Sequence, residues 1–230
     1  MSTTTLSRYA DLPALIGLMT GDEKHQAAAE STLDALWVLY DRVLDITPET
    51  ADHPDRDRFL LSKGHGPAAY YAVLAAKGFL DVRTLRRWAE FDSPLGHHPD
   101  RVLVPGAEIG SGSLGHGLGL GVGVHLGLRA QGRTTPRVFV LVGDAELDEG
   151  SNHEAIAVAG RLGLDGLTAI VIDNRSATHG WPGGITERFA REGWAARSVS
   201  GRDHTSLYEA LTLPHRGRPL AVVARVNPKG

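Results

Sequence analysis

The chain has 230 residues, of which 42% are hydrophobic and 22% charged, an ordinary composition for a globular domain. Its 24 basic and 27 acidic side chains give a formal charge of −3, which argues against a nucleic-acid-binding surface. The sequence has no cysteine, which excludes disulfides, thiolate catalysis and cysteine-based zinc sites. No apolar run is long enough to span a bilayer, and the polar start does not resemble a signal peptide, so we expect a soluble, cytoplasmic protein that does not bind membranes.

The first half of the chain is expected to be largely helical. Apolar residues at helical spacing, opposite charged ones, predict an amphipathic helix over residues 24–46 that ends before Pro48. An Ala- and Tyr-rich helix should follow over residues 66–79, and a shorter one over residues 82–91. Prolines, glycines and paired histidines then predict a long ordered loop over residues 92–112, which crosses the surface or borders a site.

Glycine is unusually frequent, with 28 residues, and it recurs in one apolar segment in the middle of the chain. Each glycine in a helix costs about 1 kcal/mol relative to alanine, so propensity alone disfavours a helix here. We nevertheless expect a helix, whose small residues allow very close packing against another backbone. The glycines concerned are Gly115, Gly117, Gly119, Gly121, Gly123 and Gly127.

The second half predicts alternating strands and helices. Residues 137–142 (RVFVLV) and 167–172 (LTAIVI) are continuous apolar runs, typical of parallel strands that are buried on both faces. The Ala-rich helix expected over residues 149–164 has a suitable length for a right-handed crossover between them. Two more strands, over 194–199 and 220–226, enclose a helix over 203–211. We therefore expect one domain, residues 1–230, with a doubly wound, mainly parallel α/β sheet flanked by helices.

Polar residues follow the two best strands where these end. Asp144 comes after the first strand and Asn174 after the second, and ligands of open α/β sheets bind beyond these carboxyl ends. Carboxylate and amide oxygens suit Mg²⁺ or Ca²⁺, and Gly143 with the following helix start can offer backbone N–H groups to a phosphate. The residues alone leave a second interpretation open, in which Gly-Asp is only a tight turn that caps a helix.

Four blocks of the sequence resemble transketolases. Residues 143–174 (GDAELDEGSNHEAIAVAGRLGLDGLTAIVIDN) are similar to the family's thiamine diphosphate motif, which opens with Gly-Asp-Gly and closes with Asn. Residues 56–79 resemble its Arg-Phe-x-Leu-Ser-Lys-Gly-His block, and residues 96–123 its Gly-His-Pro and Gly-Ser-Leu-Gly segments. Residues 25–48 resemble the helix after its Gly-His-Pro-Gly motif. The match covers nearly the whole chain in order.

The resemblance covers only the first of three transketolase domains and implies the thiamine diphosphate-binding fold. It implies the N-terminal subunit of a split transketolase, a transferase of carbohydrate metabolism. Such an enzyme moves a two-carbon ketol unit from a ketose or ketose phosphate to an aldehyde. A separate C-terminal subunit would supply the pyrimidine-binding domain, in a heterotetramer of two plus two chains.

The resemblance also implies a cofactor site. Mg²⁺, or Ca²⁺ or Mn²⁺ in its place, would be held by Asp144, Asn174 and the carbonyl of Ser176. Thiamine diphosphate would contact His65, Gly112, Ser113, Leu114, Gly143, Asp144, Ala145, Glu146, Asn174, Thr178 and His179. The metal would neutralise the diphosphate, and the cofactor would perform the carbon–carbon chemistry.

Three histidines and two glutamates match the family's catalytic groups. His25, His65 and His98 would line the cofactor and substrate funnel and transfer protons, a task that suits imidazole near neutral pH. The adjacent His97 leaves open which of the pair has this role. Glu149 and Glu154 would join a buried carboxylate network across a dimer interface, or simply complement the start of a helix.

The sequence also departs from the family. Ala145 replaces the second glycine of Gly-Asp-Gly, and residues 24–27 read KHQA where the family has Gly-His-Pro-Gly. These changes leave the substrate open. A subunit of a 2-oxo acid dehydrogenase or another carboligase is an alternative, which the Ser-Lys-Gly-His block disfavours. A non-catalytic scaffold or regulatory homologue is another.

Overall fold

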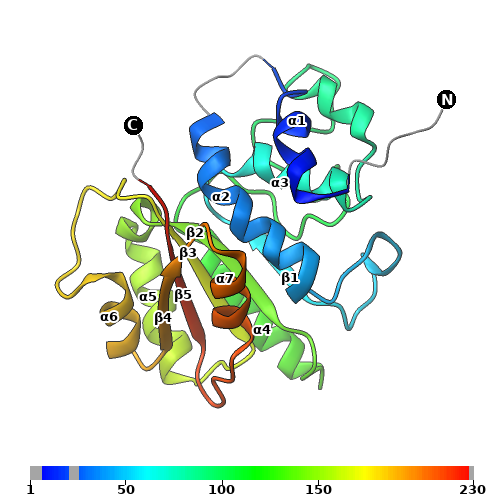
Figure 1. The fold of residues 1–230 in the computed structure, drawn as a ribbon. Coiled ribbons are helices and arrows are strands. Elements are labelled where there is room, and N and C mark those ends of the chain that lie inside the picture. The colour runs from blue at the N-terminus through cyan, green and yellow to red at the C-terminus, as the bar shows by residue number, and fades with distance from the viewer. Residues whose placement is uncertain (1–6, 21–25, 228–230) are drawn as a thin grey trace.

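The computed structural model describes residues 7–20 and 26–227, and its centre is a five-stranded sheet (Figure 1). The strands lie in the order β1-β2-β3-β5-β4, and each neighbouring pair is parallel. Their bounds are Arg58–Leu61 for β1, Val138–Gly143 for β2, Leu167–Asp173 for β3, Ala195–Ser200 for β4 and Leu220–Arg225 for β5. Because the last strand, β5, lies between β3 and β4, the sheet is not a simple sequential array.

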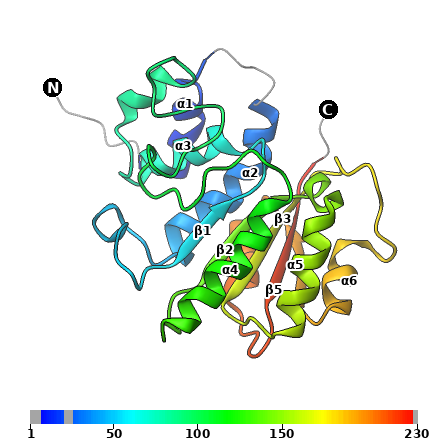
Figure 2. The same ribbon diagram turned by 180° about the vertical axis from the view of Figure 1, so that it is seen from behind.

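Helices cover both faces of the sheet (Figures 1 and 2). One face packs against α4 (His116–Ala130), α5 (Gly150–Arg161) and α6 (Gly184–Arg191). The other packs against α2 (Gln26–Val38), α3 (Pro67–Ala76) and α7 (His204–Thr212), with the short α1 (Leu12–Ile16) beside α3. The doubly wound α/β fold expected from the sequence is confirmed. In the described residues no helix combines the length and apolarity needed to cross a membrane.

The central strands are apolar throughout because each contributes to two cores. In β2, Phe139 and Leu141 belong to the core under α2 and α3, whereas Val138, Val140 and Val142 belong to the core under α4 and α5. All are at most 1% exposed, and burying such a side chain stabilises the fold by roughly 1.5–3 kcal/mol. The two-sided burial accounts for the continuous apolar runs in the sequence.

The first strand and α6 were not expected from the sequence. β1 is a four-residue strand at the edge of the sheet, directly after a charged segment, so no alternation or long apolar run marks it. The α6 helix begins at Gly184, after a second glycine, and buries only Phe189. Its mostly polar sequence gave no apolar stripe long enough to predict a helix.

Two of the expected helices differ from the prediction in helix type as well as in length. The helix expected over residues 24–46 is α-helical over Gln26–Val38 and continues as a π-helical turn over Leu39–Val43, after which Leu44 is extended. The helix expected over residues 82–91 is a 3-10 helix, Val82–Arg87. The backbone turns extended at Trp88, so the segment ends four residues earlier than predicted.

The glycine-rich helix α4 makes the expected close approach on one side only. A Cβ atom on Gly117 would lie 2.3 Å from the Oγ of Ser62, and one on Gly121 would lie 2.4 Å from a methyl of Val140. These glycines let α4 pack tightly on β1 and β2. The remaining helical glycines, Gly119, Gly123 and Gly127, have nothing within 4 Å of a Cβ position.

The parallel arrangement brings the carboxyl ends of β1, β2 and β3 to one edge of the sheet. Ser62, Asp144 and Asn174 each follow one of these ends directly. The irregular segment over residues 89–115, which we call the long loop, passes beside this edge before α4 begins (Figure 2). The loop expected over residues 92–112 is thus confirmed as irregular.

Candidate functional site

A cavity of about 200 Å³ lies where the strands end. Its walls come from the turn after β1, the long loop, the turn after β2 and the turn after β3. The lining residues are Lys63, Gly64, His65, His98, Gly112, Leu114, Gly143, Ala145, Glu146, Asn174 and Ser176. We call this space the strand-end cavity. All of its lining residues except Lys63 and Gly64 were candidate site residues in the sequence.

Asp144 lies behind the wall of the cavity and binds the segment that follows β3. It is 2% exposed and caps the 3-10 helix η6 (Ala145–Asp148), accepting a hydrogen bond from the Ala145 N–H at 2.9 Å. The Ser176 hydroxyl donates to Asp144 Oδ1 at 2.6 Å, and the Ser176 N–H donates to Oδ2 at 2.7 Å. The carboxylate therefore holds Ser176 at the edge of the cavity.

Asn174 provides an oxygen with no partner. Its side chain is 3% exposed, and its Oδ1 is buried without a hydrogen-bond partner among the described residues. A buried acceptor left in this way costs about 1–3 kcal/mol unless a ligand, ion or water satisfies it. Asn174 lines the strand-end cavity, so this oxygen fits the hard-oxygen chemistry of a divalent cation.

The described residues contain no group of three or more His, Cys, Asp or Glu side chains that could hold a metal. A cation here would thus depend on Asp144 together with amide and carbonyl oxygens. The expected set of Asp144, Asn174 and the carbonyl of Ser176 has this composition, and the Ser176–Asp144 hydrogen bonds keep two of its three residues together. The residues present therefore fit a hard divalent cation.

Glu146 joins three segments of the cavity wall. It is 2% exposed, and it accepts hydrogen bonds from the Gly115 N–H at 3.1 Å, the Gly143 N–H at 3.2 Å and the Ser62 hydroxyl. Burial raises the pKa of Glu146, and these hydrogen bonds partly oppose the shift. Ser62 in turn accepts from the Gly117 N–H at 3.1 Å, so the network fixes the start of α4 to the end of β1.

Lys63 was not among the candidates, although it lines the cavity. It is 7% exposed, and its methylenes lie 3.4–3.7 Å from a Cβ position on Gly143. Its ammonium donates to the His65 carbonyl at 3.4 Å. Lysine is rarely buried unless its charge is paired. Lys63 lies inside the Ser-Lys-Gly-His block, and this position in the sequence is the signal that could have identified it. It adds a positive charge to the cavity.

His65 and His98 reach the cavity from two different loops. His65 is exposed and stands two residues before α3, whose first residue is Pro67. The His98 ring lies against Gly112, where a Cβ would come within 2.8 Å of the ring and where φ is +111°. His97 instead meets Trp88 edge to face, with ring centroids 5.2 Å apart. The structure thus places His98, not His97, at the cavity.

Aromatic side chains fasten the first part of the long loop through its carbonyl groups. The Gly96 carbonyl accepts from the Tyr71 hydroxyl at 3.0 Å and from the Trp88 indole N–H at 3.1 Å. Further along, the Gly106 carbonyl accepts from the Tyr70 hydroxyl at 3.1 Å. Burial raises the pKa values of Tyr70 and Tyr71 well above their usual range, so both hydroxyls remain donors at neutral pH.

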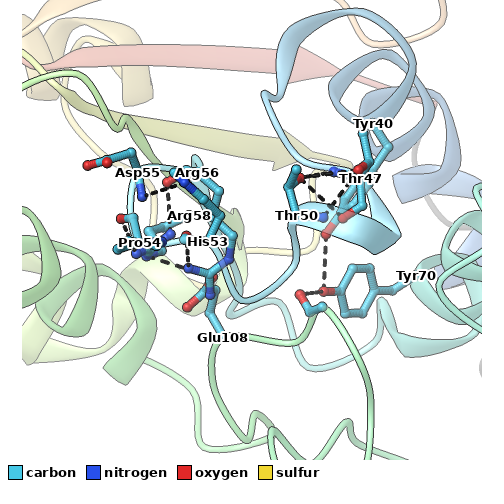
Figure 3. A network of polar contacts seen from close by, with 11 residues as sticks. Tyr40, Thr47, Thr50, His53, Pro54, Asp55, Arg56, Arg58, Tyr70 and Glu108 are labelled. Atoms are coloured by element: carbon cyan, nitrogen blue, oxygen red, sulfur yellow. Dashed lines mark hydrogen bonds and ion pairs between the residues drawn. The ribbon is translucent and has the colours of Figure 1, made fainter.

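An ion pair fastens the second part of the long loop (Figure 3). Glu108 lies 2.6 Å from the guanidinium of Arg56, just before β1, and 4.0 Å from that of Arg58, the first residue of β1. Burial raises the pKa of Glu108, while the neighbouring arginines lower it. Arg58 is itself held by the carbonyls of Pro54 and Arg56, each at 2.8 Å.

The remaining candidates that the structure describes lie outside the strand-end cavity. Glu149 and Glu154 are exposed on α5 or at its start, Ser113 and Thr178 are exposed in loops, and none of the four lines the cavity. His179 lines a second cavity, of about 390 Å³, together with Trp181. His25 falls outside the described residues.

Comparison with known proteins identifies the class of protein. Residues 19–225 match the family model described as transketolase, thiamine diphosphate binding domain. The chain therefore belongs to this family of transferases, as the resemblance in its sequence implied. Transketolase from Pichia stipitis, in the structure of its H261F mutant, superposes with a TM-score of 0.80 at 26% identity.

That comparison covers 97% of this chain but only 36% of the Pichia stipitis chain, so this chain spans about a third of such a transketolase. Shorter relatives match over more of their length. An apulose-4-phosphate transketolase subunit of Actinobacillus succinogenes is 34% identical over 210 residues, which cover 88% of this chain and 76% of that protein. The chain is thus a transketolase-type subunit, similar to proteins named as separate subunits.

A more similar relative has a different name. Ferredoxin fas2 of Rhodococcoides fascians is 60% identical over 219 residues, which cover 95% of this chain and 72% of that protein. Ferredoxin clusters are held by cysteine thiolates, and the present sequence has 0 cysteines. This chain therefore has none of the cysteine ligands that the name ferredoxin implies.

Proposed function

We propose that this chain is the N-terminal subunit of a split transketolase that depends on thiamine diphosphate and Mg²⁺. With a separate C-terminal subunit, it would transfer a two-carbon ketol unit from a ketose or ketose phosphate to an aldehyde. The observation that carries the proposal is the strand-end cavity, which gathers residues from four separate segments of the chain, among them Asn174, whose Oδ1 has no hydrogen-bond partner among the described residues. A cytoplasmic location is part of the proposal.

The chain's own part in the reaction would be to bind the metal and the diphosphate. Asp144, Asn174 and the Ser176 carbonyl would hold Mg²⁺, and the backbone at Gly143 and Ala145 would face the phosphates. Lys63 would add a positive charge, since its ammonium lies at the His65 carbonyl in the same wall. When bound, thiamine diphosphate supplies the carbon–carbon bond chemistry.

His65 and His98 would act on the substrate. Both line the cavity, and they come from separate segments of the chain, one after β1 and one in the long loop. Neutral imidazole near pH 7 can accept and donate protons at substrate hydroxyls. The contact with Gly112 limits the freedom of the His98 ring, which favours catalysis through orientation. Pro67 at the start of α3 fixes the backbone two residues after His65.

An assembly of two such chains and two partner subunits would cover an apolar face of the molecule. The exposed side chains of Leu120, Leu126, Val158 and Leu162 lie on or next to α4 and α5. Gly119, Gly123 and Gly127 leave room beside α4 for another backbone. Exposed apolar surface of this kind marks interfaces, and twofold symmetry dominates among oligomers. The exposed Glu149 and Glu154 would then be covered at the interface.

The test is a calorimetric titration of thiamine diphosphate with Mg²⁺, using this chain alone and together with a candidate C-terminal transketolase subunit. We expect binding in the assembled enzyme, and ketol transfer only when both subunits are present. Ketol transfer by the purified chain alone would overturn the split arrangement. An assembled enzyme that binds no thiamine diphosphate would overturn the proposed function itself.

A further inference from the structure

The segment after β3 is fastened to η6 through four successive backbone N–H groups. The first two belong to Ser176 and Ala177, which donate to Asp144 Oδ2 at 2.7 and 3.4 Å. The next two belong to Thr178 and His179, and both donate to Asp148 Oδ2 at 3.2 Å. We call residues 174–183 the β3 loop. Two carboxylates at the two ends of one short helix, four residues apart, thus receive consecutive amides of this loop.

The β3 loop borders both cavities. Ser176 lines the strand-end cavity, whereas His179 and Trp181 line the second one. The far end of the loop is fixed by Trp181, which stacks on His153 of α5 with centroids 4.9 Å apart and planes at 18°. The guanidinium of Arg188 on α6 lies 5.4 Å from the same indole ring. The loop is therefore held along its length and not only at its ends.

A bound cation would affect the hydrogen bonds of the two carboxylates differently. Both oxygens of Asp144 are engaged by the loop or by the Ala145 N–H, so a cation at Asp144 competes directly with the hydrogen bonds from Ser176. Asp148 does not line the strand-end cavity. Its hydrogen bonds to Thr178 and His179 can therefore persist when Asp144 turns to the metal.

We propose that Asp148 is a positioning residue, which keeps the β3 loop seated on η6 when Asp144 binds the cation and so holds Asn174 and the Ser176 carbonyl beside it. This inference rests on the proposed function, because it takes the cation to be the Mg²⁺ of the cofactor site. Asp148 does not line the strand-end cavity, in which the metal would bind. Its contribution is to the affinity for the metal, through the position of two of the ligands.

The first arm of the test uses the chain without cofactor. Asp148→Ala removes the acceptor for two amides, so we expect hydrogen exchange at Thr178 and His179, and trypsin cleavage after the exposed Arg175, to accelerate by about tenfold. Asp148→Asn retains an acceptor oxygen and should restore most of the protection. The control is Asp165→Ala. Asp165 also accepts a hydrogen bond from a backbone N–H, that of Gly217 at 3.4 Å, but it lies before β3 and not in the β3 loop or η6.

The second arm titrates Mg²⁺ into the assembled enzyme with saturating thiamine diphosphate. We expect Asp148→Ala to raise the Kd for Mg²⁺ about tenfold, with kcat at saturating Mg²⁺ within about twofold of the parent; a tenfold change corresponds to about 1.4 kcal/mol. Asp148→Asn should recover much of the affinity, and Asp165→Ala should match the parent. A merely structural residue would lower kcat and thermal stability without this selective effect on the metal.

Two outcomes separate this inference from the proposed function. A parent enzyme that binds Mg²⁺ and thiamine diphosphate while Asp148→Ala binds them equally well overturns the role of Asp148 alone. A parent enzyme that binds neither overturns the proposed function and this inference with it. Unchanged exchange at Thr178 and His179 in Asp148→Ala would show that these hydrogen bonds do not hold the loop, which also overturns the inference.

Discussion

The two loops that border the strand-end cavity are fastened by different chemistry. The β3 loop is held by two carboxylates: its backbone N–H groups donate hydrogen bonds to Asp144 and Asp148. The long loop is held mainly through its carbonyls, which accept hydrogen bonds from two tyrosine hydroxyls and an indole N–H, and through the ion pair of Glu108. At its end, the Gly115 N–H donates to the Glu146 carboxylate. The Asp144 carboxylate can exchange an N–H donor for a metal ion, whereas the tyrosine hydroxyls donate their protons to loop carbonyls and lie outside the cavity.

The two loops should therefore respond differently to a bound cation. The β3 loop should respond to the cation, because part of its fastening is also the expected metal ligand. The part of the long loop that brings His98 to the cavity should keep its place whether or not a cation is bound, since the tyrosines, Trp88 and Glu108 that hold this part do not line the cavity. Substitutions in the two loops should therefore have different effects on cofactor binding and on turnover.

The largest effect is expected at Asp144, because this carboxylate both holds the β3 loop and is an expected metal ligand. Asp144→Ala removes the only carboxylate of the expected metal set and the acceptor for Ser176, so cofactor-dependent activity should fall to background. The fold should remain intact, because the buried strands β2 and β3 hold the site edge. Calorimetric titration of thiamine diphosphate with Mg²⁺ checks the affinity, and circular dichroism checks the fold.

Two further variants sharpen this result. Asn174→Asp keeps an oxygen at the position of the unpartnered Oδ1 and should retain metal, whereas Asn174→Ala should not. Asp173→Ala is the matched control, since that carboxylate accepts the Arg175 N–H at 3.2 Å and does not line the cavity. Unchanged cofactor affinity in Asp144→Ala would mean that the metal is held elsewhere.

The next largest effect is expected at His65, which should influence turnover rather than the cofactor. General acid–base assistance is typically worth about 10²–10⁴-fold, so His65→Ala should lower kcat by roughly this range while the Kd for thiamine diphosphate changes much less. His65→Asn keeps a donor but transfers no proton, and should recover substrate affinity without the rate. Steady-state kinetics of the assembled enzyme that show His65→Ala within about twofold of the parent would make the residue structural.

A smaller effect is expected from Gly112 in the long loop. Its φ of +111° and the 2.8 Å contact between a Cβ and the His98 ring mean that Gly112→Ala must strain the backbone and displace that ring. We expect kcat to fall by about tenfold, since misplacing a catalytic group by about 1 Å costs up to about 10². Mg²⁺ affinity should change little, because this loop does not hold the metal ligands.

A matched control for this variant lies in the same loop. Gly110 has its nearest neighbour, the Pro99 carbonyl, 3.8 Å from a Cβ position, so Gly110→Ala should be tolerated. Equal losses in Gly110→Ala and Gly112→Ala would show that the loop as a whole is intolerant of change, and that the contact with His98 is not the cause.

The sequence predicted the strongly patterned parts of this molecule and missed those that depend on distant contacts. The apolar runs of β2 and β3 located Asp144 and Asn174, because parallel strands end at one edge. β1 was missed, because four edge residues carry little pattern. Asp148 was missed because its partners are backbone N–H groups about 30 residues away, at Thr178 and His179, and backbone groups leave no signal in a sequence.

The smallest effect is expected at Glu108, whose ion pair with Arg56 helps to hold the long loop. Burial raises the pKa of Glu108 above that of an unfolded glutamate, so its contribution to stability is present below the unfolded pKa and is lost as the pH rises through the folded pKa. Glu108→Gln cannot titrate. The free energy of unfolding of the parent, relative to this variant, should therefore decrease as the pH rises from about 4 toward neutral. Urea unfolding of both proteins across this range measures the difference. A relative stability that increases with pH would show that the ion pair with Arg56 at 2.6 Å outweighs the burial of the carboxylate.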